Sequence, residues 1–90
     1  MTNQNDIPEI LGAEFTRARE RAGLSTIDLA KMASLTTSHV EQIENGESSS
    51  FYSPAIKFVA AKKLASFLSL SETECFVYPE GVVTKSTKTQ

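Results

Sequence analysis

The sequence predicts a compact all-α domain of five short helices, with a helix-turn-helix formed by the second and third. Apolar residues recur at spacings of three and four along most of the chain, which is the period of one helical face. Serine, threonine or aspartate precedes these stretches, and glycine or proline interrupts them. The chain has 90 residues, of which 40% are hydrophobic. Such a chain can close one small core and has no room for a second domain.

Residues 25–46 carry the expected helix-turn-helix. Ser25 can cap the first of its two helices, and Asp28 stands where a capping box has its acid. Thr36 gives a second start signal, and Gly46 can adopt the left-handed conformation that closes a helix. The residues spaced to face the core are Leu29, Ala30, Ala33, Val40 and Ile43.

A first helix is expected to open near Asp6, to carry Pro8 in its first turn and to end at Gly23. Asp6 and Glu9 have the spacing of a capping box. The apolar face of this helix comprises Ile7, Leu11, Phe15, Ala18 and Ala22, and its other face carries Arg17, Arg19, Glu20 and Arg21.

The segment after Gly46 is rich in serine and predicts a loop, and Ser53 followed by Pro54 predicts the start of a fourth helix that runs through Leu68. This helix has two apolar stripes, which are Ile56, Ala60, Leu64 and Phe67, and Phe58, Ala61, Ala65 and Leu68. Ser71 and Glu74 predict a short fifth helix that ends near Phe76. We therefore expect a flexible N-terminus over residues 1–7, a helix-turn-helix domain over 8–76, and an extended or disordered tail over 77–90.

Composition argues against several functions. No run approaches the roughly 20 apolar residues of a membrane span, and the N-terminus lacks the features of a signal peptide, so we expect a cytoplasmic protein without a membrane segment. The single Cys75 and single His39 give no metal-ligand spacing. We expect Cys75 to be a buried structural thiol and His39 to be exposed to solvent. Because no nucleophile geometry or phosphate-binding loop is visible, we predict no enzyme activity, metal or cofactor.

The stretch LGAEFTRARERAGLSTIDLA, followed by VEQIENG, resembles the Cro/repressor-type (Xre) helix-turn-helix family over about residues 8–71. The resemblance implies a lambda-repressor-like fold, with a glutamate at Glu44 that is often tied to the first helix, here to Arg17 or Arg21. Three positions depart from that pattern. Glu41 stands where the family commonly has a small polar residue, and RodZ-like sequences have an acid there. Thr26 stands where the family usually has glutamine, and Ser34 where it usually has the turn glycine.

A narrower resemblance is to the cytoplasmic domain of RodZ-like bacterial cell-shape proteins. It rests on the long loop with its aromatics, on Pro54, and on the later Leu64-Ala65 and Leu68-Ser69-Leu70. In that family the same fold docks on the actin-like filament protein MreB, so the resemblance implies a protein partner instead of DNA.

The helix-turn-helix pattern favours a transcriptional-regulator-like protein that places the third helix in the major groove of double-stranded DNA. Short polar side chains at the start of that helix can donate to and accept from base edges, and helix N-termini favour phosphates. The candidate base-reading residues are Thr37, Ser38, His39 and Gln42, and the candidate phosphate contacts are Thr26, Lys31 and Thr36.

Charge weakens this hypothesis, because DNA-binding domains usually carry a basic surface. The formal net charge is −2, and residues 37–55 hold three glutamates but no lysine or arginine. The alternative is a protein-docking domain of the RodZ-like type, with Phe51, Tyr52 and Phe58 as anchors. An antitoxin-like homodimer, paired through the stretch FVYPEGVV, is a further alternative. We favour DNA binding because the motif is complete.

Overall fold

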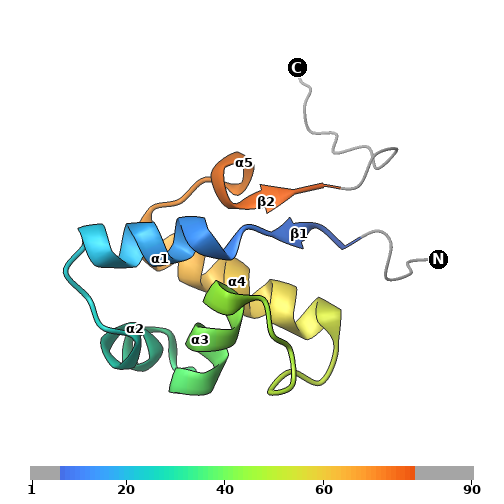
Figure 1. Ribbon diagram of the computed structural model, residues 1–90, viewed down its shortest axis with the longest axis horizontal. Coiled ribbons are helices and arrows are strands. Elements are labelled where there is room, and N and C mark those ends of the chain that lie inside the picture. The colour runs from blue at the N-terminus through green and yellow to red at the C-terminus, as the bar shows by residue number, and fades with distance from the viewer. Residues whose placement is uncertain (1–6, 79–90) are drawn as a thin grey trace.

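A computed structural model describes residues 7–78 (Figure 1). Within this range the chain forms five helices, with a short strand before the first and another after the last. The helices are α1 (Gly12–Arg21), α2 (Thr26–Ala33), α3 (Thr37–Asn45), α4 (Pro54–Leu68) and α5 (Glu72–Cys75). The strands are β1 (Glu9–Ile10) and β2 (Phe76–Val77). The predicted all-α, five-helix architecture is therefore confirmed.

Helix α1 crosses the middle of the molecule, with α2 and α3 on one side of it and α5 and β2 on the other (Figure 1). Helix α4 packs against all four other helices. The core lies where these helices meet, and its largest fully buried side chains include Phe15, Leu29, Val40, Ile43 and Leu64. The predicted core positions of the helix-turn-helix are all buried.

The beginning of the chain differs from the prediction. Glu9 and Ile10 form a strand instead of a helical turn and pair antiparallel with Val77 and Phe76. Helix α1 starts only at Gly12, with no side-chain cap on Leu11, so the expected role of Glu9 in a capping box is wrong. The backbone N–H of Leu11 instead donates to the carbonyl of Cys75 at 2.9 Å. The long-range pairing with β2 outweighs the local helical signal. This pairing could not be predicted from residues 6–9 alone.

The strand β2 also bears on two expectations about the C-terminus. Val77, the first residue of the expected tail, pairs with Glu9. The Phe76–Val77 strand, which was considered for pairing with a second copy, pairs with β1 of its own chain. Residues 1–6 and 79–90, which hold most of the predicted flexible N-terminus and tail, lie outside the described residues.

Helix α4 buries only part of its two predicted stripes. Ala60, Ala61, Leu64 and Ala65 are buried, but Ile56 and Phe67 remain exposed. Phe58 is half-buried, with its ring edge-on to Phe76 at a centroid distance of 4.9 Å. Lys57 was not among the predicted buried positions, yet it is buried although it is charged.

Cys75 is the structural thiol that was expected. It is buried, and its Sγ donates to the carbonyl oxygen of Ser71 at 3.3 Å. Burial, with Glu72 and Glu74 nearby, raises the pKa of this thiol to about 11. The thiolate is the reactive form of cysteine, so this environment disfavours reactivity.

The turn between α2 and α3 is closed by Ser34 in the left-handed conformation, with φ 59° and ψ 41°. We predict that Ser34→Gly stabilises the protein by about 0.5 kcal/mol, because this conformation strains a residue with a Cβ by more than the entropy that glycine loses on folding. Urea denaturation followed by circular dichroism measures the change. The control Ser66→Gly, at an exposed helical position of α4, should instead destabilise by about 0.5 kcal/mol. A destabilised Ser34→Gly would contradict the prediction.

Candidate nucleic-acid interface

The two helices of the motif are held by predicted caps. Ser25 and Asp28 form a reciprocal capping box, in which the Asp28 N–H donates to Ser25 Oγ at 3.0 Å and the Ser25 N–H to Asp28 Oδ2 at 3.1 Å. Thr36 Oγ1 accepts from the His39 N–H at 3.1 Å, and Gly46 ends α3 in the left-handed conformation. Local sequence signals thus set both ends of α3, whose orientation is then fixed by packing.

Helix α3 is fastened to α1 through Glu44. Arg19 donates to both carboxylate oxygens, from Nε to Oε2 at 2.7 Å and from Nη2 to Oε1 at 3.0 Å, and Thr16 Oγ1 donates to Oε1 at 2.9 Å. This hydrogen bonding raises the pKa of Arg19. The prediction that Glu44 is tied to α1 holds, but the partner is Arg19 and not Arg17 or Arg21. Arg17 bonds to Glu14 on the surface.

Five of the seven predicted DNA contacts remain at least partly accessible, and two, Gln42 and His39, are bonded to the loop after α3. Ser38, Lys31 and Thr36 are exposed, and Thr26 and Thr37 are half-buried. All five lie on α2, on α3 or at the cap of α3, so the first turn of α3 presents short polar side chains at the surface.

Gln42 is not available for base reading, and its assignment is corrected. It is only 9% exposed, and its amide is used twice within the protein. Its Nε2 donates to Ser49 Oγ at 2.9 Å, and its Oε1 accepts from the Ser50 N–H at 2.8 Å. The polar side chain that faced DNA in the prediction holds the loop after α3 instead.

His39 was expected to be exposed to solvent, but it is half-buried. Its Nδ1 lies 3.3 Å from the Thr36 N and its Nε2 lies 3.2 Å from the Ser50 carbonyl oxygen. The ring packs against that of Phe51 at a tilt of 33°, with a centroid distance of 4.7 Å. The serine-rich loop after α3 thus folds back on this helix and covers two of the four predicted base-reading residues. The spacing of residues along a helix does not reveal such a contact.

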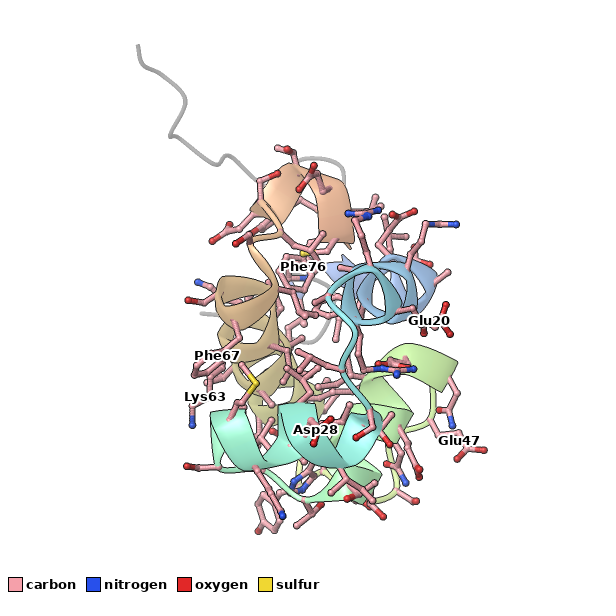
Figure 2. All side chains as sticks on the ribbon, turned by 90° about the vertical axis from the view of Figure 1, so that its left-hand side faces the viewer. Glu20, Asp28, Glu47, Lys63, Phe67 and Phe76 are labelled. Carbon is pink, nitrogen blue, oxygen red and sulfur yellow. The ribbon has the colours of Figure 1, made fainter. Side chains whose placement is uncertain are left out.

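The predicted docking aromatics also differ from one another. Phe51 is half-buried against His39 and Phe58 against Phe76, whereas Tyr52 is 94% exposed. Ile56, Val59 and Phe67 of α4 are exposed as well. Figure 2 shows Lys63 and Phe67 projecting on the side of the molecule opposite to Glu47.

These features define a helix-turn-helix domain. It has two capped helices joined by a tight turn, and the second is fixed by its C-terminal half and exposes Ser38 in its first turn. The chain belongs to the helix-turn-helix domain family, whose model matches residues 10–74. No curated protein matches the chain. Among residues 7–78, no helix is both long and apolar enough to cross a membrane.

Proposed function

We propose that this chain is a non-catalytic, cytoplasmic DNA-binding module of the transcriptional-regulator type, related to the Xre proteins, which places α3 in a major groove. The observation that carries the proposal is the first turn of α3. It carries the exposed Ser38 and the half-buried Thr37, both polar, while Ile43 and Glu44 hold the other end of the helix against the core. Helix-turn-helix domains read base edges with the N-terminal residues of this helix.

The contacts that this placement leaves available are fewer than the sequence suggested. Thr37 and Ser38 are the remaining candidates for base edges, since both can donate and accept hydrogen bonds. Thr26, Lys31 and Thr36 are candidates for phosphates, and Lys31 is the one that carries a positive charge. Binding to a single domain should therefore be weak, and two copies on one duplex would supply the missing phosphate contacts.

Lys31 offers the sharpest test of this placement. We expect a labelled random-sequence duplex to bind in fluorescence anisotropy, with an affinity that falls as salt rises. Lys31→Ala should weaken binding at low salt and reduce the slope of log affinity against log salt by about 1, because each phosphate contact releases about one counterion.

The matched control is Lys63→Ala. Lys63 is exposed on α4, which is not one of the two helices of the motif. This variant should leave the salt slope unchanged. The groove placement would be abandoned if the duplex does not bind even at low salt, or if both lysine variants reduce the slope equally.

A second candidate function is a RodZ-like protein-docking domain that binds an actin-like filament protein such as MreB. The observation in its favour is Tyr52, whose side chain is 94% exposed, close in sequence to the exposed Ile56. Exposed aromatic side chains are frequent anchors of protein interfaces. Co-sedimentation with MreB filaments tests it. Tyr52→Ala should abolish co-sedimentation, whereas unaltered protein that stays in the supernatant would exclude this partner.

A further inference from the structure

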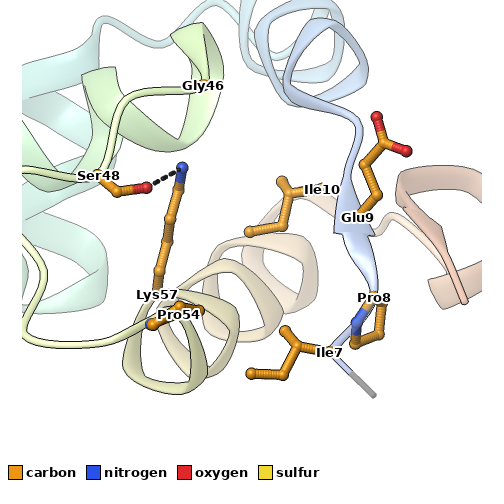
Figure 3. A pocket seen from close by; sticks show the side chains of 8 residues that line it. All are labelled: Ile7, Pro8, Glu9, Ile10, Gly46, Ser48, Pro54 and Lys57. Atoms are coloured by element: carbon orange, nitrogen blue, oxygen red, sulfur yellow. Dashed lines mark hydrogen bonds between the residues drawn. The ribbon is translucent and has the colours of Figure 1, made fainter. Parts of the chain in front are cut away.

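A cavity of about 330 Å³ lies between the N-terminal strand and the loop after α3 (Figure 3). One wall is apolar and includes Ile7 and Ile10, whose side chains point toward the stem of Lys57 (Figure 3). The acidic side chain in the lining, Glu9, points away from the lysine (Figure 3). The volume is at the lower end of the range for small-molecule sites, which are mostly apolar with a few polar groups.

The charged group at this cavity is Lys57, which is only 8% exposed. Its Nζ donates to the Glu47 carbonyl at 2.6 Å and to Ser48 Oγ at 3.1 Å. Both acceptors are neutral, and within residues 7–78 Lys57 forms no ion pair. Lysines are almost never fully buried unless they are paired. The ammonium therefore lacks a counter-charge in this part of the chain.

Lys57 has a structural role, since a cation beside the carbonyls that follow α3 is favourable there. That role uses two of the three N–H groups of the ammonium and leaves one for another acceptor. Ser48 Oγ accepts from Lys57, so its own hydrogen can be donated as well. An anion at the cavity could thus accept from two neighbouring side chains.

We propose that this cavity binds a small carboxylic acid with an aliphatic body. Its carboxylate would accept hydrogen bonds from Lys57 and Ser48, and its hydrocarbon part would lie against Ile7 and Ile10. The ligand would touch the segment that follows α3 without occupying the first turn of that helix. Binding of the acid and binding of DNA can therefore be measured separately, and the proposal does not depend on DNA binding.

The test is a titration of the full-length ¹⁵N-labelled protein with hexanoate, followed by amide chemical shifts. We expect saturable shifts that are largest in residues 7–10, 46–48 and 54–57. The neutral probe 1-hexanol has the same chain length, and we expect it to bind at least roughly tenfold more weakly because it lacks the charge that Lys57 attracts. Absence of saturable shifts up to about 10 mM hexanoate, a concentration tenfold above a millimolar dissociation constant, would overturn the proposal.

Two variants separate the cavity from general surface attraction. Lys57→Met should weaken hexanoate binding at least roughly tenfold, while Lys63→Met, the same change at an exposed position of α4, should alter it by less than about twofold. If Lys57→Met fails to fold by circular dichroism, Ser48→Ala in the exposed loop replaces it and should weaken binding measurably. Equal affinity for hexanoate and 1-hexanol, or unchanged hexanoate binding by the folded variant, would refute the carboxylate site.

Discussion

Replacing Gly12 by alanine is expected to destabilise the protein by about 3 kcal/mol or more, which is near the upper end of the usual cost of overpacking. A Cβ at this position would lie 2.2 Å from the carbonyl oxygen of Glu44 and 2.7 Å from that of Ile43. Both obstacles are backbone atoms of α3, so no side-chain rotation relieves the clash. Helix α1 can accept the methyl group only by moving away from α3. Urea denaturation followed by circular dichroism measures the loss.

Gly23→Ala is the matched control, because it adds the same methyl group where no heavy atom lies within 4 Å. Gly23 has φ 75°, so this change should cost about 1–2 kcal/mol through backbone strain alone. The difference between the two variants isolates the close approach of α1 to α3. Equal losses of stability in the two variants would show that the close approach of α3 to Gly12 adds nothing to the cost of the methyl group.

The sequence was informative where structure depends on neighbours along the chain. The capping residues Ser25, Thr36 and Ser53 could all be read in advance, because a cap bonds to a backbone N–H two or three residues away. The buried faces of α2 and α3 were equally predictable from helical spacing. The fold class follows from these local features.

The sequence was misleading where a residue bonds to a distant partner. Glu9 has good capping spacing but pairs with Val77, which lies near the other end of the domain. Gln42 has a suitable side chain for reading adenine, yet Ser49 and Ser50 occupy its amide. Polar residues on a short helix look alike in a sequence whether a loop covers them or not, so the candidate DNA contacts were overestimated. Lys57 was overlooked because its partners, Glu47 and Ser48, lie in the loop after α3 and not on its own helix.

The second large effect is expected for Arg19→Met, which should destabilise the protein by about 3 kcal/mol because it leaves the Glu44 carboxylate enclosed without its cation. The side chains of Arg19 and Glu44 are only 14% and 10% exposed. Arg19 also donates from Nη1 to the Leu24 carbonyl at 2.9 Å, so the variant loses the link between α1 and the segment leading to α2. Chemical denaturation again provides the measurement.

Arg17→Met tests whether burial, and not charge alone, decides this cost. Arg17 forms an ion pair with Glu14 at 2.7 Å, the same distance as the closest contact of Arg19 with Glu44, but its side chain is 59% exposed. Its loss should cost far less than the loss of Arg19, since water replaces an exposed partner. The double variant Arg19→Met with Glu44→Met should be more stable than Arg19→Met alone, because it removes the stranded carboxylate. A double variant less stable than the single one would mean that Glu44 acts mainly through Thr16, and that the arginine is not what orients α3.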